Sequence, residues 1–329
     1  MTEPHDGLAL YVHWPYCARI CPYCDFNVVR ARGRETEMAA LVAALVEDLE
    51  AQAGLVGPRP LVSIFFGGGT PSLMPPDAVA AVVERAQALF PASGDIEVTL
   101  EANPTDAEAE RFSALAGAGV TRLSLGVQSL DDAALKFLGR NHSGAEARRA
   151  VALAARHFAR LSIDLIYARP GQPVSDWTGS LVWARASGFE HISPYQLTIE
   201  PGTAFGRAVA RGVWTPPDDD LAADLYEATQ SVLGQAGFEA YEVSNHARGV
   251  AARSRHNLHV WRGGGYLGIG PGAHGRLTLG GVRTATVAHR GVTDYIAGVG
   301  AGRPWAERTA LSPVEAAEEK VLLGLRTVE

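Results

Sequence analysis

The stretch Leu8–Cys24, LALYVHWPYCARICPYC, contains all three cysteines of the chain, Cys17, Cys21 and Cys24. The apolar, β-rich run Leu8–Trp14 predicts a first strand, so the C-x3-C-x2-C triplet lies in the loop that leaves it. Cysteine thiolates are the usual ligands of iron–sulfur clusters, and three of them can hold three corners of a cubane. The fourth iron then has no protein thiolate and can take a small-molecule ligand. The stretch therefore predicts a [4Fe–4S] site with one open iron.

Two other roles for the triplet have to be weighed. A disulfide would leave one thiol over, and the N-terminus shows no signal-peptide pattern, which favours a reducing cytoplasm where disulfides are rare. A Cys3His zinc site is the stronger alternative, because His13 lies close to the triplet. Zinc knuckles usually separate two short cysteine arms by a longer loop, whereas these three cysteines are crowded together. The spacing favours the cluster and leaves zinc open.

The composition is that of a globular chain with a large core. The chain has 329 residues and is 47% hydrophobic, enough for one large core and a smaller appended unit. Its formal net charge is −7, so no broad basic face indicates nucleic-acid binding. No apolar run approaches the ~20 residues that a membrane-spanning helix needs. We expect neither a nucleic-acid partner nor a transmembrane segment.

Strands and helices alternate through the first two thirds of the chain. Short β-rich runs predict strands at Leu8–Trp14, Leu61–Phe66, Ile96–Leu100, Arg122–Val127, Leu161–Tyr167 and Ile192–Ile199. Helical patterns lie between them at Glu35–Gln52, Asp77–Leu89, Ala107–Ala116, Ala145–Phe158 and Ser175–Ala186. Thr105 with Glu108 predicts a capping box for the third helix. The alternation predicts an α/β fold with a parallel sheet, and six strands are too few for a closed eight-stranded barrel.

The pattern changes at about residue 216, which predicts two domains, 1–215 and 216–329. Pro216–Asp220 indicates a linker and a helix cap, opening an amphipathic helix through Leu233. The segment Gly249–Gly281 is rich in loop signals. Ser312-Pro313-Val314-Glu315 then predicts the start of another helix. We expect this second region to be smaller and α-rich.

Short motifs spread along nearly the whole chain carry a resemblance to a known family. They are Y-x-H-x-P-Y-C-x3-C-x-Y-C (Tyr11–Cys24), G-G-G-T-P (Gly67–Pro71), E-A-N-P (Glu101–Pro104), G-V-Q-S (Gly126–Ser129), G-R-N-H (Gly139–His142), I-D-L-I-Y (Ile163–Tyr167) and H-N-x-x-x-W (His256–Trp261). The chain resembles the radical S-adenosylmethionine (SAM) superfamily. More narrowly, it resembles the branch that contains oxygen-independent coproporphyrinogen III dehydrogenase (HemN) and the heme chaperone HemW. The resemblance implies an open (β/α)6 partial barrel with a [4Fe–4S] cluster and SAM.

Polar residues recur at or near the carboxyl ends of the predicted strands, where barrels place their functional groups. They are Thr70, Glu101, Gln128, Asp164 and Gln196, and the glycines Gly68 and Gly69 directly precede Thr70. By the resemblance, the glycine segment binds the amino end of SAM, and glycine allows this approach because it lacks a Cβ. The resemblance also implies that Glu101 and Asp164 accept hydrogen bonds from an amine or from ribose hydroxyls. It places Gln128 and Arg140 at the SAM carboxylate, and Tyr11 and Tyr23 beside the molecule.

Two functions within the family stay open. The dehydrogenase has a fourth cysteine at the position of Phe26 and a long arm before the cluster loop, and this chain has neither. His256–Trp261 resembles a heme-binding signature of the chaperone, with Val260 in place of a tyrosine. These features favour a chaperone that binds a cluster, SAM and heme and delivers heme to apo-hemoproteins such as those of the respiratory chain. The alternative is oxidative decarboxylation of coproporphyrinogen III. A third and less favoured function is a radical SAM reaction on another tetrapyrrole, for example the opening of heme.

The resemblance also implies heme contacts and partners. His256 is the expected heme ligand, Trp261 is expected to pack on the porphyrin, and His259 is a second candidate ligand. His274 is expected to line the SAM or cluster side of the pocket. Family members continue into a small helical domain, so this chain is expected to be truncated before it. A donor of electrons to the cluster is an expected partner.

Overall fold

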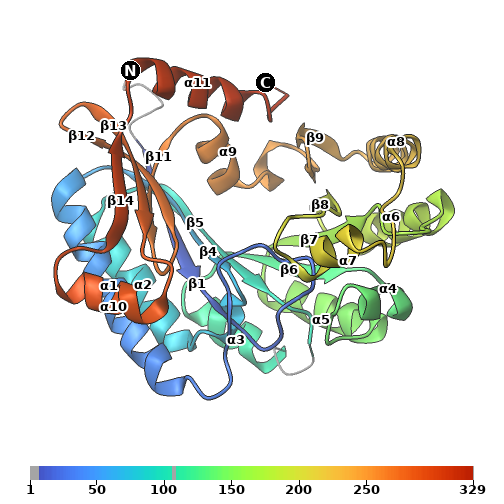
Figure 1. The fold of residues 1–329 in the computed structure, drawn as a ribbon, viewed down its shortest axis with the longest axis horizontal. Helices are drawn as coiled ribbons and strands as arrows, with labels where there is room; N and C mark the ends of the chain where they lie inside the picture. Colours follow the sequence, from blue (N-terminus) through green and yellow to red (C-terminus); the bar gives the residue numbers. More distant parts are fainter. Residues whose placement is uncertain (1–6, 106–108, 329) are drawn as a thin grey trace.

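Six parallel strands form the centre of the molecule (Figure 1). The structure, a computed structural model, describes residues 7–105 and 109–328. The six strands are β1 Leu8–Trp14, β4 Leu61–Gly68, β5 Ala92–Ala102, β6 Arg122–Gln128, β7 Arg160–Tyr167 and β8 His191–Gln196. Each strand pairs in parallel with the next in that order, so all six predicted strands and the parallel α/β fold are confirmed.

Helices connect these strands and cover one face of the sheet. They are α1 Glu35–Val56, α2 Pro76–Leu89, α3 Ala109–Gly117, α4 Asp132–Phe137, α5 Gly144–His157 and α6 Val174–Ala186, with a 3-10 turn at Pro71–Leu73. All are close to the predicted ranges except α4, which was not predicted. Glu108 lies outside the described residues, and so the predicted capping box with Thr105 does too. A complete capping box opens α5, where Ser143 and Glu146 satisfy each other's backbone N–H groups.

Six further strands extend both edges of the central sheet. They are β9 Glu239–Glu242, β10 Asn245–Ala247, β11 Gly265–Ile269, β12 His274–Leu279, β13 Val282–Ala288 and β14 Trp305–Ala310. The described residues form a 12-stranded sheet in the order β14-β13-β12-β11-β1-β4-β5-β6-β7-β8-β10-β9. Strand β11 is parallel to β1, and β12, β13 and β14 continue as an antiparallel meander. Within these residues the two ends of the sheet do not pair, so the barrel is open.

The region after residue 216 contains the expected helices and also strands that were not predicted. Helices α8 Asp219–Gln235, α9 Arg255–Trp261, α10 Val292–Gly300 and α11 Pro313–Gly324 are present, after α7 Ala204–Ala210 and with a 3-10 turn at Val250–Ala252. The segment Gly249–Gly281, expected as loops, contains α9, β11 and β12. The two strands could not be recognised from the sequence, because glycines flank them and interrupt the period-2 pattern that identifies a strand. The caps at Asp218 and Ser312 lie where they were predicted.

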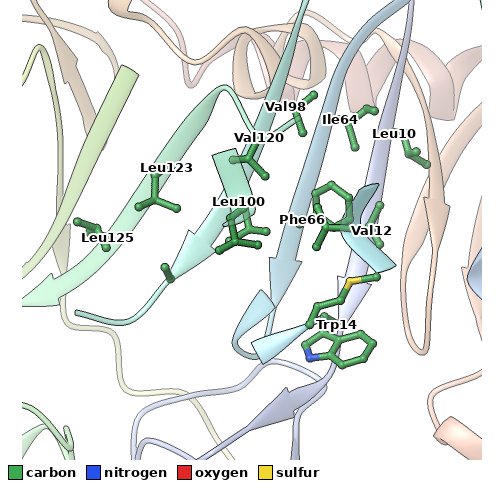
Figure 2. Close-up of a cluster of buried hydrophobic side chains, with 14 of the residues drawn as sticks. Leu10, Val12, Trp14, Ile64, Phe66, Val98, Leu100, Val120, Leu123 and Leu125 are labelled. Carbon is green, nitrogen blue, oxygen red and sulfur yellow. The ribbon is translucent and has the colours of Figure 1, made fainter. Parts of the chain in front are cut away.

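A continuous apolar core lies between the sheet and its covering helices (Figure 2). On β1, Leu10, Val12 and Trp14 face this core and are fully buried. Ile64 and Phe66 of β4 continue the same layer (Figure 2). Because side chains alternate along a strand, the residues between them point to the other face, inside the partial barrel. That inner face carries the polar groups described below.

None of the helices within the described residues has the length and apolar character needed to cross a bilayer.

Candidate functional site

The cysteine triplet lies in a loop that two very short strands close. Strand β2, Tyr16–Cys17, pairs in parallel with β3, Val29–Arg30. The Val29 N–H donates to the Pro15 carbonyl at 2.8 Å, and the next rung joins the Ala31 N–H to the Cys17 carbonyl at 2.9 Å. The cysteines are free, with Cys17 buried and the other two half-buried. These hydrogen bonds hold the two ends of the loop together at Cys17, and Cys21 and Cys24 lie in the part of the loop between those ends.

Each of the three sulfurs has a hydrogen-bond donor beside it, which for Cys24 is the Phe26 backbone N–H. Arg140 donates from Nη1 to the Cys21 Sγ at 3.4 Å. The Thr70 hydroxyl bonds the Cys17 sulfur and in turn accepts a bond from Asn103 Nδ2 at 3.1 Å. Arg140 also donates from Nη2 to Asn103 Oδ1 and to the Gly126 carbonyl. Such donors favour the thiolate form, which is the form that binds metal.

Burial nevertheless favours the protonated form of two of the thiols, Cys17 and Cys24. It raises the pKa of Cys17, and it raises that of Cys24 to about 11, with the neighbouring thiols adding to the effect. Because metal ligands must be deprotonated, loading this site would release protons. In the part of the chain that the structure describes, no group of three or more His, Cys, Asp and Glu side chains is arranged to hold a metal ion.

His13, the alternative zinc ligand, is already engaged through both ring nitrogens. Nε2 lies 2.8 Å from the Asn27 carbonyl and Nδ1 lies 2.9 Å from the Tyr11 hydroxyl. A carbonyl only accepts, so Nε2 carries the proton and Nδ1 accepts from Tyr11. Burial lowers the pKa of His13, which keeps the ring neutral. The imidazole thus has no free lone pair, and zinc is disfavoured.

The glycine segment after β4 packs closely against the first strand and the cluster loop. A Cβ on Gly68 would lie 2.5 Å from the His13 ring, and the φ of Gly68, +108°, is one that other residues rarely adopt. A Cβ on Gly69 would lie 2.8 Å from the Pro15 backbone. Gly69 N–H also donates to the Trp14 carbonyl at 2.8 Å. These glycines are required for the close approach of β4 to the cluster loop.

Two carboxyls lie on the inner face next to this segment. Glu101 accepts from the Gly68 N–H at 3.3 Å, and Asp164 accepts from the Ser124 hydroxyl at 3.1 and 3.2 Å. Burial, and then the charge of Asp164, raise the pKa of Glu101 to about 8. Burial likewise raises the pKa of Asp164. Two half-buried carboxyls that repel each other form a site suited to a ligand with positive charge and hydroxyl groups.

The other residues assigned to SAM by resemblance lie around the same end of the sheet. Gln128 ends β6 with a φ of +63°, a left-handed backbone, and its amide nitrogen lies close to Gly126. Gln196 ends β8 and is exposed. Tyr23 packs on Phe205, with ring centroids 6.3 Å apart. Arg140 already donates from both terminal nitrogens, while its buried Nε has no partner among the described groups. The contacts of these residues with SAM stay predictions.

A cavity of about 680 Å³ lies beside the cluster loop. It is lined by Tyr11, His13, Asp25, Phe26, Asn27, Phe65, His256, Asn257, Val260, Trp261, Tyr266, Gly272, His274, Val287, Arg290 and Glu307. The structure therefore brings four of the predicted residues, Tyr11, His256, Trp261 and His274, into one cavity. The residues that directly follow Cys24 form part of its wall.

His256 is fixed in this cavity by contacts on several sides. Its Nδ1 lies 3.0 Å from the Ser63 hydroxyl, and its ring lies 4.9 Å from that of Phe65. Its backbone N–H donates to Glu97 at 3.0 Å. Nε2 has no hydrogen-bond partner among the described residues. Burial lowers the pKa of His256 to about 3, so the imidazole is neutral and keeps a lone pair.

Sequence reasoning missed the residues that hold His256. Ser63 and Phe65 lie within the apolar strand β4, and Glu97 lies within β5, at a sequence separation of 159 from its partner. No motif marks them, because their role depends on which strand α9 covers. The packing of α9 on β4 brings these residues to the histidine.

The remaining predicted heme contacts have distinct environments. His259 bonds the Gly265 carbonyl at 2.8 Å and so fixes the turn between α9 and β11. The Arg326 guanidinium lies over the Trp261 ring, 4.4 Å from its centroid, in a cation–π contact. His274 is exposed on the cavity lining, and burial together with Arg276 lowers its pKa. Its side chain forms no hydrogen bond within the described part of the chain.

Known proteins with similar sequences identify the family. The model of the radical SAM superfamily matches residues 11–184. Radical S-adenosyl methionine domain-containing protein 1, mitochondrial, of Bos taurus is 44% identical over 325 residues, which cover 97% of this chain and 73% of that protein. The heme chaperone HemW of Escherichia coli is 41% identical over 273 residues, covering 83% of this chain and 71% of that protein.

A solved structure confirms the fold independently. Coproporphyrinogen III oxidase (HemN) of Escherichia coli superposes with a TM-score of 0.82 over 99% of this chain and 76% of that one, at 21% identity. The open partial barrel and its added strands are thus a known arrangement. By its sequence and its fold, the chain belongs to the radical SAM superfamily, and within it to the family that contains the heme chaperone HemW.

Proposed function

We propose that this protein is a heme chaperone that binds a [4Fe–4S] cluster, SAM and heme and delivers heme to apo-hemoproteins. The observation that carries the proposal is the cavity beside the cluster loop, into which α9 brings His256. At about 680 Å³, this cavity falls within the range of small-molecule and cofactor sites. Its aromatic lining suits a flat macrocycle, and Arg290 at its exposed rim suits a propionate.

His256 is the proposed ligand of the heme iron because of how it is held. Metal-binding histidines usually bond through the second ring nitrogen to a fixed neighbour, which sets the tautomer and the ring orientation. Ser63 is that neighbour here, since it bonds Nδ1 and leaves Nε2 without a partner among the described residues. Glu97 accepts from the His256 backbone and anchors the start of α9. Both act as positioning residues for the imidazole.

The groups around the cysteines fit a cluster. Cys17, Cys21 and Cys24 would hold it, Thr70 and Arg140 would donate to the sulfurs, and the unpaired Arg140 Nε remains for a further acceptor. When bound, such a cluster supplies one-electron chemistry toward SAM at its open iron. The fold buries Cys17 at the base of the loop and leaves Cys21 and Cys24 half-buried.

The groups around Gly68 fit SAM. The half-buried pair Glu101 and Asp164 offers negative charge to the sulfonium and the amine, and acceptors to the ribose. The delivery of heme to respiratory-chain hemoproteins, a cytoplasmic location and an electron donor for the cluster belong to the same proposal. Proteins named HemW at about 40% identity support it.

An anaerobic heme titration of the cluster-reconstituted protein, followed by Soret absorbance, tests this function. We expect saturation at one heme per chain and a loss of affinity of at least tenfold in His256→Ala. His157→Ala is the matched control, because His157 is exposed at the end of α5, away from the cavity. If heme binding does not saturate, the chaperone proposal is wrong. Turnover of coproporphyrinogen III by the same sample would then establish the alternative, the dehydrogenase.

A further inference from the structure

The inner face of the sheet presents a row of side chains that begins at His274. Tyr266 pairs with Arg276, so two positions further along the antiparallel pair Gly268 lies opposite His274. Gly268 pairs in turn with Tyr11, and Tyr11 with Phe65. Residues paired across neighbouring strands point to the same face. His274, Tyr11 and Phe65 therefore share one face, and all three line the cavity.

Gly268 stands in this row between His274 and Tyr11. A Cβ at Gly268 would lie 1.9 Å from the His274 carbonyl oxygen, so no larger residue fits at this position. The backbone of His274 therefore packs directly on Gly268, and this close approach brings the start of β12 against β11, the neighbour of β1, at the edge of the cavity.

The far end of the row carries the second imidazole. His256 packs on Phe65 and is held by Ser63, so its ring lies over β4. Strand β12 is three strand spacings from β4, which is roughly 14 Å. An iron bound between two imidazole nitrogens separates them by about 4 Å, twice a metal–nitrogen bond of about 2 Å. The distance of about 14 Å between β12 and β4 therefore leaves room for two imidazoles that lean toward each other with an iron between their nitrogens.

We propose that His274 is the second axial ligand of the heme iron, so that the cavity holds heme between His256 and His274. This inference rests on the proposed heme binding and adds a residue that no sequence motif assigned to the iron. Both ligands are neutral nitrogen donors, which suit ferric and ferrous heme alike.

The two ligands differ in how firmly the protein holds them. His256 is 6% exposed, with Nδ1 bonded and its ring packed. His274 is exposed, and its side chain has no hydrogen bond among the described residues. The fixed imidazole retains the heme, whereas the loosely held one exchanges with a ligand from the acceptor protein. This asymmetry suits a protein that must both bind its cargo and release it.

The test compares wild type, His274→Ala, His256→Ala and the His157→Ala control, all as the full cluster-reconstituted chain. Absorption and electron paramagnetic resonance spectra of the ferric heme complex report the number of axial nitrogens. We expect a six-coordinate low-spin complex in wild type and in the control. His274→Ala should give a high-spin spectrum, weaken binding less than His256→Ala does, and transfer heme to apomyoglobin at least tenfold faster. Added imidazole should restore the low-spin spectrum.

The outcomes separate the two proposals. If wild type binds heme but His274→Ala keeps the low-spin spectrum and the transfer rate, the role of His274 is overturned and the chaperone function stands. If wild type binds no heme, both fall together. Cluster absorbance and far-UV circular dichroism, unchanged in His274→Ala, would show that the variant is folded. His274→Gln, which keeps a polar side chain of similar size, must give the same spectral change.

Discussion

Asp48 on α1 is a buried carboxyl whose replacement by asparagine should stabilise the protein. Its side chain is fully buried and accepts hydrogen bonds from the Tyr295 hydroxyl at 2.6 Å and from Gln52 Nε2 at 2.9 Å. Burial raises the pKa of Asp48 to about 6. In Asp48→Asn the new amide oxygen would still accept from Tyr295, but the bond from Gln52 would be lost, because Gln52 Nε2 also donates to the Gly268 carbonyl at 3.1 Å and cannot turn away.

The size of the effect follows from the pKa shift. Folding raises the pKa of Asp48 from 3.8 to about 6. Ionisation of this carboxyl therefore lowers the free energy of unfolding by about 3 kcal/mol. Because the folded pKa is raised, the carboxyl carries no such cost below pH 3.8, and the cost grows as the pH rises to about 6. Above that pH it is constant. Asparagine does not ionise, so Asp48→Asn should gain up to about 3 kcal/mol over wild type at pH 8 and little at pH 4.

Urea unfolding of both proteins at half-unit intervals from pH 4 to pH 8 measures this difference directly. Other titrating groups cancel when the wild-type free energy of unfolding is subtracted from that of the variant. Asp224→Asn, an exposed position in α8, is the control and should change stability by less than about 0.5 kcal/mol at any pH. A variant that is less stable than wild type at pH 8, or whose advantage does not depend on pH, would refute the reasoning. The two hydrogen bonds to the ionised carboxylate would then outweigh its burial.

Three further predictions concern the site. Burial and Asp164 raise the pKa of Glu101 to about 8, and a cationic ligand favours the ionised form, so SAM should bind up to tenfold more tightly per pH unit from pH 6 to about 8. Isothermal titration calorimetry should show this slope in wild type and a flat profile in Glu101→Gln. Glu97→Gln leaves Arg160 without its 2.6 Å ion-pair partner and should cost about 3 kcal/mol of stability by urea unfolding, whereas a loss below about 1 kcal/mol would contradict a buried pair. Cys17→Ser should lose iron and sulfide in elemental analysis while the far-UV circular dichroism stays that of wild type, and unchanged iron would overturn the ligand assignment.

The central strands could be predicted from sequence because each is a short apolar run buried on both faces. Leu61–Phe66 and Leu161–Tyr167 are such runs, and the structure places β4 and β7 there. The helices between them followed from their period of 3.6 residues. Caps such as Ser312 with Glu315 were readable because they depend only on neighbouring residues. Local physics was sufficient for these elements.

Strands added from the far end of the chain could not be predicted in this way. Gly265–Ile269 is short and begins with glycine, and it becomes a strand because β1 offers it an open edge. The role of Ser63 could not be predicted either. It bonds His256 only because α9 packs on β4, and the two residues are 193 positions apart in the sequence. These features depend on contacts between distant parts of the chain, and no local pattern records them.

Asn27 connects the cluster loop to the cavity through hydrogen bonds. Its side chain donates to the Pro271 carbonyl at 2.8 Å and to the Arg290 carbonyl at 2.9 Å, and its own carbonyl accepts from His13. Asn27 closely follows Cys24 in the chain and ties the cluster loop to the segment that leads into His274. Hydrogen bonds of Asn27 therefore connect the cluster loop directly to the cavity wall. For that reason, the loading of the cysteines and the position of the exchangeable imidazole are expected to be coupled.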